Sequence, residues 1–172
     1  MLLFFRFFLM MLASRFRSRI GPLDESVVRF TVLPNDCDVN IHLNGGRFLS
    51  FMDISRADLI ARTGLLRPML KRGWRPVMGG AVVRYRREIR PFERFRIRSR
   101  VIGWDEKWFY VEHIVEKQKD TFCAIGHART VIRGKGGTIR PSEVLTLVGA
   151  ENTPSPELPE FVRHWSDAEN TR

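Results

Sequence analysis

The fold is decided by one stretch of the sequence, residues 35–62, which reads NDCDVNIHLNGGRFLSFMDISRADLIAR. Its first ten residues are polar and typical of a loop, and Asn44 has the side chain of a good helix N-cap. The apolar positions that follow recur at near-helical spacing: Phe48, Phe51, Met52 and Leu59. This pattern predicts a largely buried helix over about residues 46–62, ended by Gly64.

Segments before and after this helix have the alternation of apolar and polar residues that is typical of strands. Residues 26–33, before the helix, show it, and a short second helix is expected after it at about residues 65–71. From Gly80 the apolar period changes to two, which predicts four further strands: 81–89, 94–103, 107–116 and 121–133. Because their links are short, antiparallel neighbours are the simplest arrangement. The order of these helices and strands along the chain predicts an α+β fold, in which one curved antiparallel sheet must cover a single long helix.

Length and composition fit one folded domain. The chain has 172 residues, of which 44% are hydrophobic and 28% are charged. This usage is close to that of ordinary globular proteins and argues against disorder, a coiled coil or a polytopic membrane protein. Two cysteines cannot form a disulfide framework, and the four histidines show no metal-ligand spacing. We therefore expect a reducing cytoplasm and no metal site.

The positive charge is unevenly placed. The formal net charge is +10, and residues 84–100 carry eight arginines against two glutamates. In the strand predicted at 94–103, alternate residues put Arg94, Arg96, Arg98 and Arg100 on one face. Guanidinium groups grip phosphates, so the alternatives are a polyanionic partner and a solvated basic face. Nucleic acid is not the expected partner, because no helix-turn-helix, zinc finger or RNA-binding aromatic motif accompanies the arginines.

The first 20 residues form a segment of their own. Every position through Ala13 except Arg6 is apolar, a run too short to span a bilayer. The order also differs from that of a cleavable signal, because three arginines follow the apolar run. The alternatives are a helix lying in an anionic membrane interface, a segment packed on the protein or a partner, and an export signal. We expect the first, in a cytoplasmic protein attached peripherally to the inner face of a membrane.

The chain therefore divides into three parts: the apolar and basic segment 1–20, a globular domain over residues 21–149, and a tail over residues 150–172. The tail is acidic and rich in proline. One short amphipathic helix is expected at residues 158–165, and the rest of the tail is expected to be mobile.

The loop and the helix together carry a signature. The hotdog-fold thioesterases of the 4-hydroxybenzoyl-CoA thioesterase type have a motif that reads Asp-x-Asp-x-x-x-His-x-Asn-Asn-x-x-Tyr, followed by an acid and an arginine further along the helix. This chain resembles it at Asp36, Asp38, His42, Asn44, Asp53 and Arg56. It departs at Gly45 and Phe48, where the family usually has Asn and Tyr. The resemblance covers roughly residues 26–133 and is closest to a branch that includes thioesterase superfamily member six. It implies the hotdog fold and acyl-CoA thioesterase activity.

The resemblance also implies roles for four residues. Asp38 is the expected catalytic carboxylate, either as a nucleophile or as a general base on water. The backbone amide of Gly45 is expected to polarise the thioester carbonyl, because the first N–H groups of a helix have no intrahelical partner. His42 is expected to organise the loop, and Asn44 to act in the site or to serve only as the N-cap.

Several of these residues have a purely structural alternative. Asp38 can be a turn former, and His42 a structural histidine. Asp36 is expected to be an exposed loop acid. Asp53 and Arg56, three residues apart, are expected to pair within the helix and alternatively to shape the pocket.

An acyl-CoA substrate without a separate cofactor follows from the same resemblance, and so does a homodimer or dimer of dimers with active sites at the subunit interface. Exposed edges of a single sheet also favour pairing of subunits. The phosphates of coenzyme A are expected to bind an arginine rim, with residues 94–100 as the alternative location. Its candidate members are Arg84, Arg86, Arg87, Arg90 and Arg56.

Two other functions fit the sequence less well. Hydratases of the MaoC type have a loop that resembles Asp-x-Asn-Pro-x-His, but residues 38–42 are one residue short of it and lack the proline. The other alternative is a non-catalytic acyl-CoA binder or regulator whose arginine face contacts nucleic acid or an anionic membrane. A serine hydrolase is not expected, because the chain has no G-x-S-x-G motif.

Overall fold

The computed structural model describes residues 2–118 and 120–170. Its central helix, α2, spans Gly45–Arg62. The strands are β1 Ser26–Thr31, β2 Arg75–Tyr85, β3 Arg94–Trp104, β4 Phe109–Lys117, β5 Thr121–Gly134 and β6 Gly137–Ile139. The other helices are α1 Leu2–Ser14, α3 Leu66–Lys71, α4 Pro141–Thr146, α5 Glu160–Asn170 and the 3-10 turn Pro34–Asp36.

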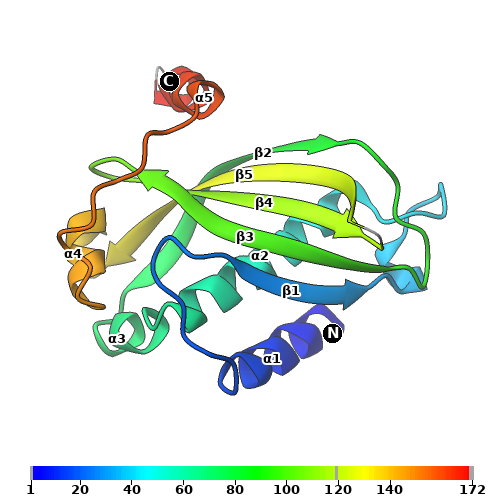
Figure 1. The fold of residues 1–172 in the computed structure, drawn as a ribbon, viewed down its shortest axis with the longest axis horizontal. Helices are drawn as coiled ribbons and strands as arrows, with labels where there is room; N and C mark the ends of the chain where they lie inside the picture. Colours follow the sequence, from blue (N-terminus) through cyan, green and yellow to red (C-terminus); the bar gives the residue numbers. More distant parts are fainter. Residues whose placement is uncertain (1, 119, 171–172) are drawn as a thin grey trace.

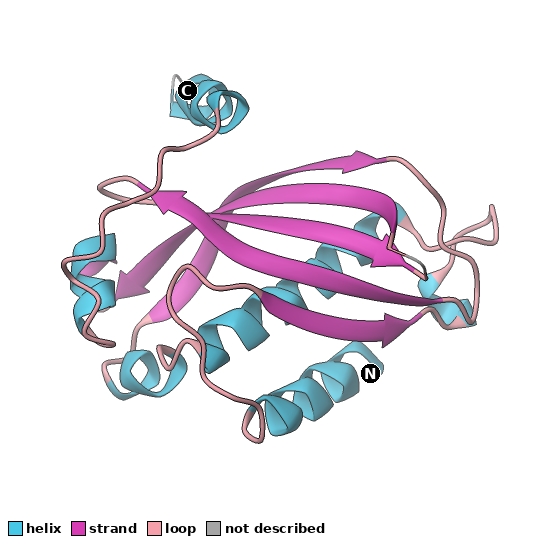
Figure 2. Ribbon diagram, in the orientation of Figure 1, coloured by secondary structure: helices cyan, strands magenta, loops and turns pink. Residues whose placement is uncertain are grey.

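The strands form an antiparallel sheet in the order β1-β3-β4-β5-β2, and β6 pairs with the end of β5. Helix α2 lies along one face of this sheet, and α1 runs beside β1 (Figures 1 and 2). The α+β class and the arrangement of one sheet around one long helix are therefore confirmed.

One expectation about strand order is wrong. Strand β2 does not pair with β3, the next strand in sequence, but lies at the opposite edge of the sheet against β5. The link between them is anchored in the core: Ile89 is fully buried, and its carbonyl accepts a hydrogen bond from the Leu43 N–H at 2.8 Å. The link therefore crosses the amino end of α2 instead of closing a hairpin.

The bounds of β2 also differ from the prediction, since the strand begins at Arg75 and ends at Tyr85. Gly79 and Gly80 interrupt the apolar pattern, and for this reason the first half of β2 was not predicted from the sequence. The ring of Trp108 lies against Gly79, where a Cβ would clash with it. The register with β5 also shifts between Met78 and Gly80. A close approach by a bulky ring therefore explains a glycine that reads as a break in the sequence.

Aromatic side chains hold α2 on the sheet. Phe51 is fully buried, and its ring centroid lies 4.8 Å from that of Phe30 in β1 and 5.2 Å from that of Phe95 in β3. Complete burial of a phenylalanine side chain contributes about 1.5–3 kcal/mol. The three rings therefore form a strong attachment of α2 to the edge of the sheet formed by β1 and β3.

Polar side chains form a chain through this core. The Ser55 hydroxyl donates to the Ile97 carbonyl at 3.5 Å, the Ser99 hydroxyl donates to Ser55 at 2.9 Å, and Ser99 Oγ lies 2.7 Å from His113 Nδ1. Because a serine has one hydroxyl proton, Ser99 must accept from the Nδ1–H of His113. The Nε2 atom is then an unprotonated acceptor, buried and without a partner in the described part of the chain. Burial lowers the pKa of His113 to about 3, so the ring is neutral.

Helix α1 packs on the domain with its charged residue turned inward. Arg6 pairs with the buried Asp36 at 2.8 Å and donates to the Thr31 carbonyl at 3.1 Å, while Met10 joins the core. The opposite face is apolar and exposed, including Phe4, Phe5, Phe8 and Leu12. None of the described helices is long and apolar enough to cross a membrane.

The tail over residues 150–170 is packed on the protein, so the expectation of mobility is wrong. Ser155 accepts a hydrogen bond from the Trp104 N–H and donates one to the Trp104 carbonyl, both at 2.8 Å. In α5, Val162 and Ser166 are buried, and the hydroxyls of Ser166 and Tyr110 lie 2.6 Å apart. Composition alone suggested mobility, whereas partners on β3 and β4 fix the segment. The predicted helix at 158–165 is observed as α5.

The neutral state of His113 makes stability depend on pH. An unfolded histidine takes up a proton below its ordinary pKa of about 6.5, whereas folded His113 does so only near pH 3. The unfolded state therefore binds more protons between these values, and the free energy of unfolding should fall by a few kcal/mol, on the order of the pKa shift, as pH decreases from about 6.5 to 3.

Urea unfolding at a series of pH values measures this effect in the wild type and in His113→Gln. We expect a smaller decrease in the variant. His164→Gln, at an exposed position of α5, is the control and should follow the wild type. Parallel curves for His113→Gln and the wild type would contradict the assignment.

Candidate active site

The loop before α2 is a tight turn held by its backbone. The Ile41 N–H donates to the Asp38 carbonyl at 3.0 Å, and the Asp38 N–H donates to the His42 carbonyl at 3.1 Å. Cys37 and Leu43 form an isolated β-bridge at its base. Ile41 has a φ of 56°, a left-handed conformation that is costly for a β-branched residue. Such strain is typical of functional loops, and here it fixes Asp38 and His42 as neighbours.

Asp38 has one carboxylate oxygen engaged and one free. Its Oδ1 accepts from the Asn40 N–H at 2.9 Å and lies 3.8 Å from His42 Nδ1. Within the described residues, no hydrogen bond reaches its Oδ2. The side chains of Asp38 and His42 are 24% and 31% exposed, so both are accessible to a ligand. Asp38 is thus a turn former through one oxygen, and the other is available as a nucleophile or base.

Asn44 caps α2, as predicted. Its Oδ1 accepts from the Gly46 N–H at 2.9 Å, and its carbonyl accepts from Arg47 and Phe48. The Gly45 N–H, in contrast, has no hydrogen-bond partner among the residues that the structure describes. It lies in the first turn of the helix, where the dipole carries partial positive charge. A free donor of this kind is suited to stabilising an oxyanion.

The structure adds Tyr85 to this site, a residue that the sequence analysis missed. Its hydroxyl donates to the Gly45 carbonyl at 2.9 Å, and its ring packs edge to face on Phe48 with centroids 5.2 Å apart. Burial raises the pKa of Tyr85, so the hydroxyl keeps its proton. The contact ties the end of β2 to the start of α2. The available signal was alternation, which puts Tyr85 on the same face of β2 as Val83.

Asp36 has a structural position, and the expectation of an exposed acid is wrong. Its side chain is buried, pairs with Arg6 and accepts from the Leu33 N–H at 2.9 Å. Its carbonyl accepts from the Asn44 N–H at 3.0 Å. Asp36 therefore links α1, the loop and the helix cap. The lone charge of Arg6 within an apolar run was the signal for this pairing.

Asp53 and Arg56 form the intrahelical ion pair that their spacing predicted. Arg56 follows Gly45 by eleven residues, which is about 16 Å along the helix axis, so one protomer does not bring it to the Asp38 loop. It lies between two small cavities under α2. One is almost entirely apolar, with a volume of about 50 Å³, and the other, of about 10 Å³, is lined in part by His113.

The candidate arginines of the coenzyme A rim differ in their surroundings. Arg84 and Arg86 flank Tyr85, are exposed, and have no ion pair in the described part of the chain. Arg87 donates to a backbone carbonyl of β5 at 3.0 Å, and Arg90 pairs with a neighbouring glutamate at 2.7 Å. Arg84 and Arg86 are therefore the members of the rim that are free to bind a phosphate.

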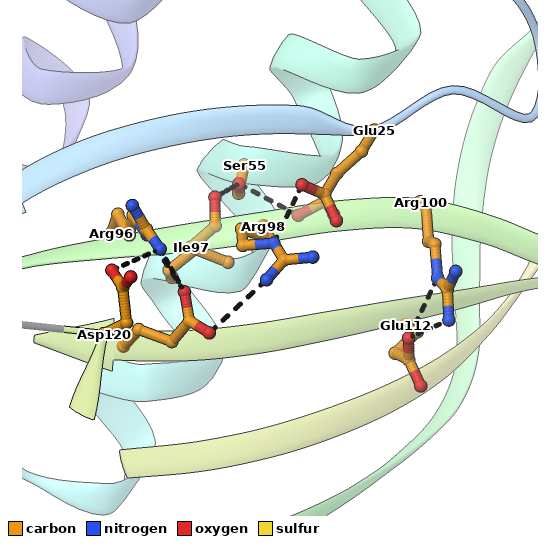
Figure 3. A network of polar contacts seen from close by, with 10 residues as sticks. Glu25, Ser55, Arg96, Ile97, Arg98, Arg100, Glu112 and Asp120 are labelled. Carbon is orange, nitrogen blue, oxygen red and sulfur yellow. Dashed lines mark hydrogen bonds and ion pairs between the residues drawn. The ribbon is translucent and has the colours of Figure 1, made fainter. Parts of the chain in front are cut away.

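The arginine row of β3 is largely neutralised on the face of the sheet away from α2. Figure 3 shows three of its members paired with acids: Arg96 with Glu116 and Asp120 at 2.9 and 2.7 Å, Arg98 with Glu25 at 2.8 Å, and Arg100 with Glu112 at 2.9 Å. A polyanion bound there would have to displace these carboxylates. The alternative rim at residues 94–100 is therefore disfavoured.

Comparison with known proteins gives the family. Residues 32–166 match the thioesterase-like superfamily. Protein THEM6 of Xenopus laevis is 36% identical over 155 residues, which cover 87% of this chain and 73% of that protein. A probable thioesterase of Saccharomyces cerevisiae is 30% identical over 122 residues, which cover 69% of this chain and 53% of that protein.

A solved structure has the same fold. It is a hypothetical thioesterase from Streptococcus pneumoniae with coenzyme A, and it superposes with a TM-score of 0.55 at 12% identity, over 69% of this chain and 83% of that one. The family match extends over most of the present sequence, including the Asp38 loop, α2 and strands β2 to β6. This chain therefore belongs to the thioesterase-like superfamily and is a thioester hydrolase.

Proposed function

We propose that this thioesterase hydrolyses an acyl-CoA thioester to a free acid and coenzyme A. The observation that carries the proposal is that one short segment holds a carboxylate with an oxygen that accepts no hydrogen bond, Asp38, and a helix-start N–H without a partner among the described residues, Gly45. A thioester carbonyl needs an attacking group on one side and a hydrogen-bond donor where oxyanion charge develops. The Asp38 loop leads directly into the turn that holds this donor, so both groups belong to one rigid segment.

Asp38 has two chemical routes. As a nucleophile, its oxygen bonds to the thioester carbonyl carbon, the C–S bond breaks, and the thiolate leaves. One water then hydrolyses the anhydride and restores the Asp38 carboxylate, and of the two protons of that water one goes to the thiolate and one to the acid product. As a general base, Asp38 takes a proton from the water that attacks directly, and the leaving thiolate receives it. Both routes consume one water overall, and in both the Gly45 N–H stabilises the oxyanion.

Coenzyme A is assigned to the surface around Tyr85 and the Asp38 loop. Arg84 and Arg86 offer unpaired guanidinium groups for its phosphates. Val39 and Ile41, which are 95% and 71% exposed, offer apolar contacts for the pantetheine arm. The Streptococcus pneumoniae thioesterase, which has this fold and was solved with coenzyme A, supports the substrate class. The proposal requires no separate cofactor.

A homodimer or dimer of dimers is part of the proposal. Strand β2 is an eleven-residue edge strand, and most of its residues are exposed, including Val77 and Met78. Its outer edge has no strand partner in the described chain. Long unprotected edges promote pairing with another chain. Pairing there would place a second subunit beside Tyr85 and α2, next to the proposed active site.

Peripheral membrane contact through α1 is also proposed. Phe4, Phe5 and Phe8 are 80%, 57% and 64% exposed, on a helix whose buried face carries Arg6. Each phenylalanine immersed in a bilayer interface contributes about 1 to 2 kcal/mol in proportion to the area covered. Uncovered apolar surface of this extent marks an interaction site, and the arginines that follow α1 favour an anionic membrane.

Replacing Asp38 tests the catalytic assignment. Asp38→Asn should lower kcat for acyl-CoA hydrolysis by about 100-fold or more, because it removes the attacking or basic group. Fold stability should change little, since the side chain is partly exposed. Release of free thiol from an acyl-CoA panel is the measurement. Asp24→Asn, in the loop before β1, is the control, and equal rates for both variants would refute the role of Asp38.

Removing the helix cap tests the position of the Gly45 amide. Asn44→Ala should reduce the free energy of unfolding by about 1 kcal/mol and lower kcat more than it changes KM, because the first turn of α2 loosens. Urea unfolding and steady-state kinetics measure both effects. Ser50→Ala, at a half-buried position on the same helix, should change stability by less than about 0.5 kcal/mol. Equal effects of the two substitutions would contradict the capping role.

A charge on the β2 edge tests the dimer. Met78→Lys should shift the protein toward monomer at micromolar concentration, because it puts a cation at the proposed subunit contact. Light scattering coupled to size exclusion measures the mass of the particle. Leu70→Lys, at an even more exposed position on α3, should leave the mass unchanged. A wild-type protein that is monomeric under these conditions would disprove the dimer.

A further inference from the structure

A basic hollow lies where the carboxyl ends of α1 and α2 meet α3. Its volume is about 820 Å³. Five arginines line it, and we call them together the arginine hollow: Arg15, Arg17, Arg19, Arg62 and Arg67. None of the described residues that line it is acidic. The hollow is thus a concave surface of one sign of charge, the form that concentrates anions.

Arg62 forms the floor of the hollow. Its side chain belongs to the last turn of α2 and the residue is only 9% exposed. The Nε–H donates to the Ser18 carbonyl at 3.1 Å. Its two terminal nitrogens have no hydrogen-bond partner among the described residues. Burial, followed by the nearby charge of Arg17, lowers the pKa of Arg62. These two nitrogens face the hollow and are available to donate hydrogen bonds to a bound anion.

One carboxylate of the protein pairs with an arginine of the hollow. Asp58, fully buried on α2, pairs with Arg17 at 2.9 Å and also accepts from Ser26. Arg15, Arg19 and Arg67 are exposed and have no ion pair within the described chain. The two helix ends offer about half a negative charge each, which attracts arginines but does not balance four of them. The hollow therefore carries a positive charge that an external anion can neutralise.

The apolar surroundings indicate the kind of anion. Met11 and Ser14 of α1 also line the hollow, which therefore reaches the carboxyl end of that helix. Phe16 is 82% exposed on one side, and Leu70 is 64% exposed on the other. When α1 lies in a bilayer interface, these side chains reach the acyl region and the arginines stand at the level of the headgroups. Guanidinium groups bind phosphate in bidentate fashion.

We propose that the arginine hollow binds the phosphate of an anionic phospholipid while α1 lies in the membrane interface. This inference rests on the proposed membrane contact and is independent of the thioesterase chemistry. The hollow lies at the end of α2 opposite to Gly45, about 26 Å along the axis, and so is separate from the active site of the same protomer.

Vesicle sedimentation of the full chain tests the proposal. The vesicles contain phosphatidylcholine alone or equal parts of phosphatidylcholine and phosphatidylserine. Arg19→Gln combined with Arg67→Gln removes two exposed arginines of the hollow and avoids the buried Arg62, whose loss endangers folding. Arg100→Gln combined with Arg163→Gln is the control, because it removes the same charge from β3 and from α5, at positions that do not line the hollow.

We expect the wild type to prefer the vesicles with phosphatidylserine. The hollow variant should lose about 30-fold of its affinity for them, at about fivefold per arginine, and keep its affinity for phosphatidylcholine. The control variant should lose no more than about twofold. Equal losses in the two variants would mean diffuse charge attraction and would overturn the proposal.

Two further arms separate this proposal from others. Phe4→Ser combined with Phe8→Ser should abolish binding to both vesicles, and a wild type that binds neither would refute membrane contact altogether. Binding that does not depend on the hollow arginines would refute the headgroup site alone.

Soluble phosphates are the last arm. A rise in Tm with inorganic phosphate, lost in the hollow variant and without preference for phosphatidylserine, would assign the hollow to a free anion. An increased KM for acyl-CoA in that variant would assign it to coenzyme A. Either result overturns the lipid proposal, whereas unchanged hydrolysis of soluble acyl-CoA is expected.

Discussion

Burial of one side of α2 is the constraint on which the rest of the structure depends. A helix of 18 residues with Phe48, Phe51 and Met52 on one side needs more cover than any hairpin provides, and the whole sheet supplies it. Once α2 is fixed on the sheet, its first turn is fixed as well. The link between β2 and β3 crosses that end of the helix, and the Ile89 carbonyl accepts a hydrogen bond from the Leu43 N–H of the loop. The position of the Gly45 amide is therefore a consequence of core packing.

The same burial encloses two carboxylates, and arginines of the first 20 residues neutralise both. Asp36 lies before the start of α2 and pairs with Arg6, while Asp58 lies near its end and pairs with Arg17 just after α1. A buried acid without its partner costs about 3–5 kcal/mol. The two pairs force the arginine-bearing side of the segment inward, and the phenylalanines have to face outward. The unusual exposure of α1 is thus the result of electrostatics in the core.

The class of fold and the main elements follow from sequence periodicity, since α2 and strands β3, β4 and β5 appear close to their predicted bounds. The predictions that were wrong, on the start of β2 and on the tail, depended on contacts between residues far apart in the sequence. In the sequence, Gly79 interrupts the pattern of a strand, but the structure shows that a glycine is needed there because the ring of Trp108 packs against it. The tail was predicted to be mobile, but Ser155 hydrogen-bonds to the backbone of Trp104. In the candidate site, the capping role of Asn44 could be predicted because an N-cap contacts residues next to it in the sequence. The contact of Tyr85 with Gly45 could not be predicted, because 40 residues separate the two in the sequence.

The Asp36 pair also connects α1 to the loop of the candidate active site. Its side chain holds Arg6 of α1, and its carbonyl holds the N–H of Asn44, the cap that positions Gly45. Asp38 lies only two residues further along the chain. A force that shifts α1 acts directly on Asp36, because the side chain is buried and its contacts are short. Residues 2–14 are consequently part of the scaffold of the candidate active site, because the Asp38 loop and the exposed phenylalanine face of α1 share one structural support, the pair of Arg6 and Asp36.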